Sequence, residues 1–191
     1  MKQIGCKYLI SPCAAGSLQK EVKPGDIVFC DQFVDWTFGR RKDTFFEGPI
    51  VTHVSAAETY CPNLRKLAIQ SAEKLGLSFH KTGTVVVING PRFSSKAESK
   101  FFTSQGWHVI NMTQYPESYL AKEMDMCPLN ISLITDYDAG LVSDTEPVSH
   151  GAVMEVFKNN IENLKALLIQ IITDFEEYDC ACHKTFENSR V

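Results

Sequence analysis

The apolar residues of this chain form short runs of strand character that alternate with stretches of helical spacing. The clearest run, TVVVI at residues 84–88, is apolar almost throughout, as expected for a strand covered on both faces. Similar short runs predict further strands at residues 7–12, 27–30, 109–112 and 131–135.

Three helices are expected between these runs. From Pro62 onward, apolar residues recur every three or four positions, and Gly76 suits the end of this helix. Ser95 followed by Glu98 matches a capping box, which predicts a second helix. A third helix can start at Pro116, because proline is tolerated in the first turn.

A fourth and longer helix is expected near the carboxyl end, with Ser149 as its cap. Its apolar stripe indicates packing in a core or against another subunit. The stripe consists of Val153, Val156, Phe157, Ile161, Leu164, Leu167, Leu168 and Ile171. Residues 35–49 show no such period and are expected to form a loop. The alternation of strands and helices predicts an α/β fold with a largely parallel or mixed sheet, and the length favours a single domain.

Charge and composition narrow the possible functions. The 19 Lys and Arg residues against 23 Asp and Glu residues give a net charge of -4, which argues against a general polyanion binder, so no nucleic-acid partner is expected. The longest apolar stretch, residues 164–172, is too short to span a bilayer, and residues 1–20 lack the apolar core of a signal peptide. We therefore expect a cytoplasmic protein with no membrane partner.

The seven cysteines are an odd, scattered set without the framework of a secreted domain. Most are expected to be small buried hydrophobes or inert thiols. Cys180 and Cys182 stand apart because a single residue separates them. A metal site would need more ligands than His183, which lies nearby, so a redox pair or two idle thiols are the remaining interpretations, with idle thiols favoured.

Ligand sites in α/β sheets gather at the carboxyl ends of strands. The segment CAAGS, expected to be a turn, can offer backbone N–H groups at Gly16 to an anion. Phe93 offers a flat face to a ring, and Thr113 places a hydroxyl beside a helix N-terminus. Asp136 and Asp138 form a carboxylate pair suited to proton exchange or to binding an amino group. Each also has an ordinary structural explanation, and together they indicate an α/β enzyme that binds a phosphate and an aromatic ring.

Six motifs carry a resemblance to a known family. They are AAGSL (14–18), PGDIVFCDQFVD (24–35), GRRKDTFFEGP (39–49), NGPRFSSKAES (89–99), INMTQYPE (110–117) and TDYDAGL (135–141). These motifs closely resemble the methylthioadenosine phosphorylase branch of the purine nucleoside phosphorylase family, and the tail CACH (180–183) is similar to the CxC tail of prokaryotic members. The resemblance implies one three-layer α/β/α domain over residues 1–191, with a central mixed sheet and a tail from about residue 175.

The resemblance also implies phosphorolysis, in which inorganic phosphate attacks the anomeric carbon of a purine nucleoside and the purine leaves. The first expected substrate is S-methyl-5'-thioadenosine, with phosphate as co-substrate and with neither a cofactor nor a metal. Asp136 is implied to share a proton with the imidazole nitrogen of the purine, and Asp138 to accept a hydrogen bond from the exocyclic amino group. A dry site would favour this proton sharing at neutral pH.

Further roles are implied in the same way. Met112 would pack beneath the ribose and Phe93 beside the purine. The other implied roles are substrate binding (Ala15, Gly16, Tyr137), phosphate binding (Cys13, Ala14, Thr113), substrate specificity (Ser94, His150, Val153) and a contribution to a neighbouring subunit's site in a homotrimer (His53).

Three features depart from the family pattern. The Gly-rich loop and the Arg–His pair of the family's phosphate site lie upstream of the position that matches Met1. The chain therefore resembles a member without its amino-terminal portion, and we expect residues 1–191 alone to turn over nucleoside very slowly. Cys13 replaces a threonine that often binds phosphate, and a thiol is a weaker donor. His150 replaces the valine of methylthio-specific members, whereas Ser94 matches them.

Three alternatives stay open on the sequence alone. The first is a broader purine nucleoside phosphorylase that acts on adenosine or inosine. The second is a truncated, non-catalytic remnant of the family. The third is a hydrolytic nucleosidase that uses water, although the Met112–Thr113 phosphate motif argues against it.

Overall fold

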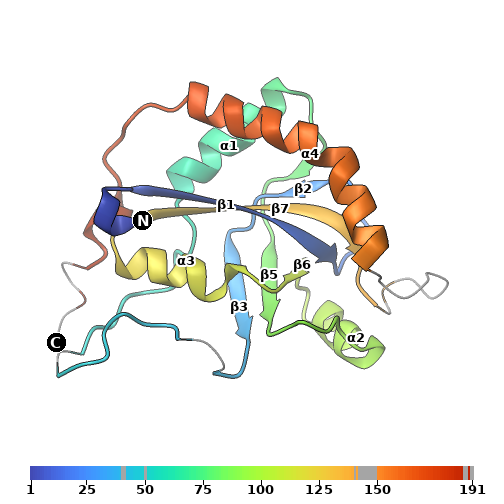
Figure 1. The fold of residues 1–191 in the computed structure, drawn as a ribbon, viewed down its shortest axis with the longest axis horizontal. Coiled ribbons are helices and arrows are strands. Elements are labelled where there is room, and N and C mark those ends of the chain that lie inside the picture. Colours follow the sequence, from blue (N-terminus) through green and yellow to red (C-terminus); the bar gives the residue numbers. More distant parts are fainter. Residues whose placement is uncertain (40–41, 50, 140, 142–149, 187–188, 190–191) are drawn as a thin grey trace.

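The computed structural model describes residues 1–39, 42–49, 51–139, 141, 150–186 and 189. Seven strands in this part of the chain form one sheet (Figure 1). They are β1 (Tyr8–Ser17), β2 (Ile27–Val28), β3 (Gln32–Trp36), β4 (Phe79–His80), β5 (Thr84–Ile88), β6 (Val109–Asn111) and β7 (Cys127–Tyr137). Their order is β3-β5-β6-β1-β7-β2-β4. The sheet is mixed, because β1 runs parallel to β7 but antiparallel to β6, and β2 is antiparallel to β7.

The α-helices of the described chain cover both faces of this sheet (Figure 1). They are α1 (Pro62–Lys74), α2 (Lys96–Ser104), α3 (Gln114–Glu123) and α4 (His150–Thr173), and short 3₁₀ turns lie at Lys2–Ile4 and Ala181–Lys184. Helices α1 and α4 lie on one face, and α2 and α3 lie toward the other. The predicted α/β/α fold with a central mixed sheet is therefore confirmed.

The apolar core between the sheet and helices α1 and α4 fixes the position of β7. Leu129, Ile131 and Leu133 of β7 alternate onto this face and are almost completely buried. Leu64 of α1 and Leu167 of α4 pack in the same cluster, both with 0% exposure. Burial of one such side chain stabilises the fold by about 1.5–3 kcal/mol. The residues at the carboxyl end of β7 are thus held by a rigid strand.

The opposite face of β7 carries a buried polar network centred on the sulfur of Cys13. The Sγ atom accepts from the side-chain amides of Asn111 at 3.4 Å and of Asn130 at 3.5 Å, and it lies 3.5 Å from Ser132 Oγ. Gln114 Nε2 points to the same sulfur from α3 at 3.9 Å. Buried polar groups with satisfied hydrogen bonds favour one arrangement of the elements that carry them. This network therefore helps to fix how β1, β6, β7 and α3 meet.

The two central strands are longer than the sequence indicates. The expected turn at residues 13–17 is wrong, because β1 continues through these small residues and pairs with β7 along its whole length. Strand β7 likewise begins at Cys127. A register shift between Ala15 and Gly16 leaves Thr135 as an extra residue on β7. Strands β3 and β4 have no counterpart among the expected strands; both are short and lie at the edges of the sheet. The loop expected at residues 35–49 is wrong at its start, because β3 continues to Trp36 by pairing with β5.

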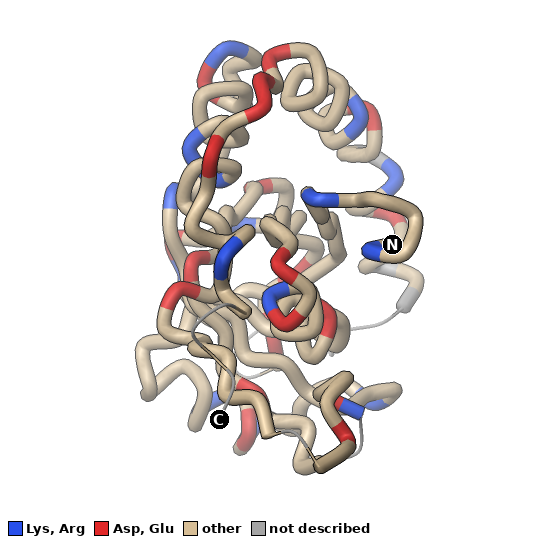
Figure 2. The backbone as a smooth tube through the Cα atoms, turned by 90° about the vertical axis from the view of Figure 1, so that its left-hand side faces the viewer, with Lys and Arg blue, Asp and Glu red and all other residues tan. Residues whose placement is uncertain are grey.

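Two predicted helix starts agree with the structure, whereas α3 begins at Gln114, two residues before the expected start at Pro116. Ser95 and Glu98 form the expected capping box at α2, and Pro62 lies in the first turn of α1. The expected cap Ser149 lies outside the described residues. Figure 2 shows Lys and Arg positions mixed with Asp and Glu positions over the face in view, in line with the small net charge. Among the described helices, none has the length and apolar character that crossing a membrane requires.

Candidate active site

A cavity of about 410 Å³ lies at the ends of the neighbouring strands β5, β6, β1 and β7. Its walls are mainly apolar with a few polar groups, which is typical of a small-molecule site. The residues that line it are Cys13, Ala14, Ala15, Gly16, Ile88, Pro91, Phe93, Ser94, Ile110, Asn111, Met112, Thr113, Thr135, Asp136, Asp138, Val153 and Met154. The fold thus brings together most of the residues that the sequence analysis assigned to substrate, phosphate and specificity.

Two carboxylates reach this cavity from the end of β7. Asp136 and Asp138 are two positions apart, so strand alternation places both on the same side. Burial raises the pKa of Asp136 to about 6; a 2.7 Å hydrogen bond from Thr135 Oγ1 opposes this shift, and the charge of Asp138 adds to it. Burial also raises the pKa of Asp138, which is 3% exposed. Asp136 can therefore hold or release a proton close to neutral pH.

The carboxylate of Asp138 faces the hydroxyls of Ser94 and Ser99. These two hydroxyls moderate the rise in the pKa of Asp138 that burial causes. Asp138 Oδ2, Ser94 Oγ and Ser99 Oγ are all buried, and none of them makes a hydrogen bond of good geometry within the described chain, so the two hydroxyls act on Asp138 only weakly. A buried acceptor left without a donor costs about 1–3 kcal/mol. An N–H group of a ligand in the cavity would supply the missing donor to Asp138.

The backbone of β1 lies unusually near to these carboxylates at Gly16. A Cβ atom at this position would lie 3.0 Å from Ile110 Cγ2 and 3.3 Å from Asp136 Oδ2. Both distances are shorter than ordinary van der Waals contact, so a larger residue would displace one of these side chains. Glycine at this position therefore keeps room for the carboxylate of Asp136 at the cavity wall.

Met112 and Phe93 provide apolar surfaces on other walls of the cavity. Gly90 has a φ of +62°, and a Cβ atom there would lie 2.5 Å from Met112 Sδ. Glycine is thus required at position 90 both by its backbone conformation and by the space that Met112 occupies. Phe93 is 39% exposed, which leaves part of its ring open to a ligand.

The residues assigned to phosphate also line the cavity. Thr113 is the N-cap of α3, so the positive end of that helix dipole points toward the site. Ala14 is exposed on β1, one residue from Cys13. The Cys13 sulfur accepts hydrogen bonds from Asn111 and Asn130, which makes it a structural acceptor here. Within the described part of the chain, the lining contains no Lys, Arg or His side chain.

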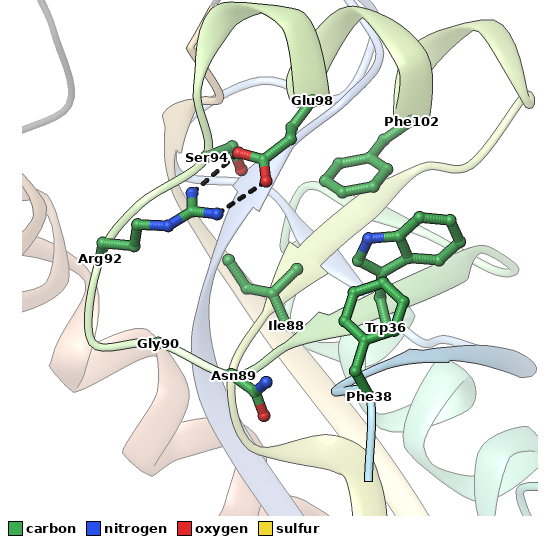
Figure 3. A pocket seen from close by; sticks show the side chains of 9 residues that line it. All are labelled: Trp36, Phe38, Ile88, Asn89, Gly90, Arg92, Ser94, Glu98 and Phe102. Atoms are coloured by element: carbon green, nitrogen blue, oxygen red, sulfur yellow. Dashed lines mark hydrogen bonds and ion pairs between the residues drawn. The ribbon is translucent and has the colours of Figure 1, made fainter. Parts of the chain in front are cut away.

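An ion pair fixes the loop that carries Ser94 (Figure 3). The guanidinium of Arg92 donates to both carboxylate oxygens of Glu98, at 2.8 and 2.7 Å, and these hydrogen bonds hold the pKa of Glu98 at about 2. Behind this loop lies a smaller hollow of about 150 Å³, walled by the rings of Trp36 and Phe102 among others. Arg92 is therefore bound to α2, and its charge serves to position the loop.

Three assigned residues do not appear among the described lining residues. Tyr137 lies between the two carboxylates in sequence, so alternation along β7 turns it away, and its hydroxyl donates to Lys20 O at 3.3 Å. The Tyr137 side chain is therefore not among the described residues that line the cavity. His53 is exposed, and its backbone N–H donates to Ser189 O at 2.8 Å. His150 is the first residue of α4, and its side chain lies outside the described part of the chain.

Sequence reasoning missed two groupings that the fold creates. Ser99 lies on α2 and comes close to Asp138 only in the folded chain; its place in the motif at residues 89–99 is the sequence signal that could have found it. The second grouping brings Cys180 and Cys182 of the tail beside Cys61 and Cys127, which the spacing along the chain does not indicate.

The fold and the site define an α/β protein whose small-molecule cavity presents two buried carboxylates and an apolar wall. The sequence profile of the Phosphorylase superfamily matches residues 1–173, and the chain belongs to this family. In sequence, the chain is 45% identical to the S-methyl-5'-thioadenosine phosphorylase of Thermofilum pendens over 192 residues, which cover 100% of this chain and 72% of that protein. It is 39% identical to the purine nucleoside phosphorylase of Streptomyces coelicolor over 193 residues, covering 95% and 68% of the two chains.

Solved structures show the same similarity. The methylthioadenosine phosphorylase of Schistosoma mansoni in complex with adenine matches with a TM-score of 0.92 and 31% identity, over 99% of this chain and 74% of that one. A methylthioadenosine phosphorylase from an Antarctic soil metagenomic library matches with a TM-score of 0.92 and 31% identity, over 100% and 67% of the two chains.

Proposed function

We propose that this protein catalyses the phosphorolysis of S-methyl-5'-thioadenosine to adenine and 5-methylthioribose 1-phosphate. The observation that carries this proposal is the pair Asp136 and Asp138, buried together in an apolar cavity of about 410 Å³. The names of the relatives and of the similar structures support the same substrate. The proposed role is in the salvage of purines and of methionine.

The chemistry follows from the two carboxylates. An oxygen of inorganic phosphate forms a bond to the anomeric carbon, the bond from that carbon to the purine nitrogen breaks, and the bonding electrons leave with the purine. Protonated Asp136 gives its proton to the imidazole ring of the departing base, which a pKa of about 6 permits near neutral pH. Asp138 accepts a hydrogen bond from the exocyclic amino group and so selects a 6-aminopurine.

The sugar and phosphate ends of the site are assigned from the same cavity. Met112 lies beneath the ribose, and the apolar side chain of Val153 favours a methylthio group over a hydroxyl at the 5' carbon. Thr113 and the exposed backbone at Ala14 contact phosphate, which acts as co-substrate, and no cofactor is required. Positioning phosphate against the anomeric carbon supplies most of the rate enhancement.

The remaining assignments concern assembly and class. We propose that the enzyme is a glycosyltransferase of the pentosyltransferase class. We also propose that it acts in the cytoplasm. A homotrimer would explain why His53 is exposed and remote from the cavity of its own chain, because it would complete a neighbouring subunit's site. Light scattering on the active protein tests this assignment, and an active monomer would exclude it.

Release of adenine, with and without inorganic phosphate, tests the proposed reaction. The 191-residue chain is incubated with S-methyl-5'-thioadenosine, adenosine or inosine, and the products are separated by chromatography. We expect very slow but phosphate-dependent release with preference in that order, lost in Asp138→Asn and retained in Asp179→Asn, whose side chain is 84% exposed. Release without phosphate would identify a nucleosidase. Binding of adenine without any phosphate signal in calorimetry would identify a non-catalytic family member.

A preference for inosine would favour the second candidate, a broader purine nucleoside phosphorylase. The observation that supports it is the identity of 39% to the Streptomyces coelicolor protein of that name.

A further inference from the structure

Four buried cysteines meet on the α1 and α4 side of the sheet, in the same core cluster as the apolar side chains of β7. Cys61 precedes α1, Cys127 begins β7, and Cys180 and Cys182 belong to the tail that follows α4. All four sulfur atoms lie within 4.8 Å of one another, and Cys61 Sγ and Cys180 Sγ are 3.6 Å apart. None of these residues lines the nucleoside cavity in the described chain.

The spacing of the sulfurs matches a tetrahedral metal centre. Zinc binds thiolate sulfur at about 2.3 Å, so the edges of a regular tetrahedron of four such ligands measure about 3.8 Å. The contact of 3.6 Å and the upper limit of 4.8 Å lie on either side of that value. A disulfide requires about 2.05 Å between two sulfurs, which is much shorter than the 3.6 Å between Cys61 Sγ and Cys180 Sγ. A single disulfide would also leave the other two cysteines of the cluster unexplained.

The surroundings of the cluster supply donors to thiolate sulfur. The backbone N–H of Leu64, in the first turn of α1, donates to Cys61 Sγ at 3.5 Å, and the hydroxyl of Tyr178 lies 3.5 Å from the same atom. The ring of His183 donates from Nδ1 to the Asp125 carbonyl oxygen at 3.1 Å, so its Nε2, which faces Cys127 Sγ at 3.8 Å, is not a donor in the neutral ring. Such outer partners orient metal ligands and stabilise their charge.

We propose that Cys61, Cys127, Cys180 and Cys182 form a structural zinc site. Four sulfur ligands in a closed, buried, tetrahedral arrangement are the donor set of structural zinc, and they leave no open position for chemistry. Each thiol passes its proton to solvent when the metal binds. The bound ion would join the carboxyl-terminal tail to α1 and to the start of β7, in addition to the contacts of Tyr8 with Phe175 and Tyr178.

Metal binding to the wild-type chain provides the direct test. The protein is purified with a reductant, stripped of metal, and titrated with Zn²⁺ or with Co²⁺, whose visible absorption reports tetrahedral thiolate coordination. We expect about one equivalent to bind, with charge-transfer bands from sulfur to cobalt, and we expect bound Zn²⁺ to raise Tm because it binds only the folded state. The absence of thiolate-type cobalt bands, or failure of the reduced chain to take up zinc, would overturn the proposal.

Matched variants locate the site. Cys182→Ser and Cys127→Ser should each lower zinc occupancy at least tenfold, whereas Cys6→Ser, outside the cluster, should leave it unchanged. Far-UV circular dichroism establishes that each variant is folded before its metal content is compared. Zinc that still binds after both Cys127 and Cys182 are replaced would show that the metal site lies elsewhere and would refute the assignment. Mass spectrometry of the chain purified without reductant shows whether the four cysteines have formed two disulfides. Two disulfides, together with no zinc uptake after reduction, would refute the zinc site and identify a disulfide cluster.

Discussion

The choice between a 6-amino and a 6-oxo purine should depend on Asp136 as well as on Asp138, and the substitution Asp136→Asn tests the part of Asp136. The carboxyl group of Asp136 can give a proton to the imidazole ring of the base, because burial holds its pKa at about 6. An amide at this position has no such proton to give, but its NH₂ group can donate to a carbonyl oxygen. The substitution nearly conserves volume, so the cavity wall that Gly16 and Ile110 form should be preserved.

The size of the effect follows from the burial of the site. A carbonyl oxygen opposite the carboxylates leaves buried acceptors without donors, at about 1–3 kcal/mol. We therefore expect the ratio of the dissociation constants for hypoxanthine and adenine to fall by about 5- to 150-fold in Asp136→Asn. Calorimetry with the two free bases at pH 7 measures this ratio directly and does not depend on turnover.

The control is Asp179→Asn, which removes the same charge from an exposed position and should leave the ratio unchanged. If Asp136→Asn weakens adenine binding and hypoxanthine gains nothing, the amide does not reach the 6-position, and the proposed contact scheme is wrong. If neither affinity changes, Asp136 does not contact the base at all.

Three further predictions concern pH, helix capping and packing. The folded state holds the proton of Asp136 up to about pH 6, whereas the unfolded chain releases it near pH 4. The free energy of unfolding of the wild type, measured with urea, should therefore fall by about 2–3 kcal/mol between pH 4 and 7 relative to that of Asp136→Asn. A difference that stays constant with pH would contradict the raised pKa. Ser95→Ala removes the cap of α2 and should lower the free energy of unfolding by about 1 kcal/mol. Glu98→Gln can keep the cap but loses the ion pair with Arg92, and it should lower the free energy of unfolding by less. A larger effect of Glu98→Gln would refute this division of roles. Gly16→Ala places a methyl group 3.0 Å from Ile110 Cγ2 and 3.3 Å from Asp136 Oδ2, and it should lower the free energy of unfolding by about 1–3 kcal/mol and weaken adenine binding. Unchanged binding would show that the carboxylate of Asp136 has room to move.

The sequence predicts elements well where a local signal determines them. The β-branched run at residues 84–88 and the capping box of Ser95 and Glu98 both appear in the structure as expected. The small residues 13–17 resemble a turn because they have low strand propensity, and they form a strand only because β7 pairs with them. That pairing joins residues about 120 positions apart, so no local pattern reveals it.

The same limit applies to the candidate site. Asp136 and Asp138 could be found from sequence, because carboxylates at the end of a buried strand are a recognisable pattern. The orientation of Tyr137 was missed because the strand continues through it, and strand alternation then turns it away. The grouping of Cys61 with Cys180 depends on how the tail packs against α1, which the spacing of cysteines along the chain does not encode.

The long parallel pairing of β1 with β7 has a consequence for how the molecule opens. Strands β1 and β7, of ten and eleven residues, form the middle of the sheet, and pairing them closes a loop of roughly 120 residues, whose entropy cost precedes the gain from the contacts. Amide hydrogens in this pair should exchange with deuterium only through global unfolding, whereas those of the two-residue edge strand β4 should exchange through local opening. Asp136 and Asp138 would therefore keep their positions during fluctuations that already expose the rim of the sheet.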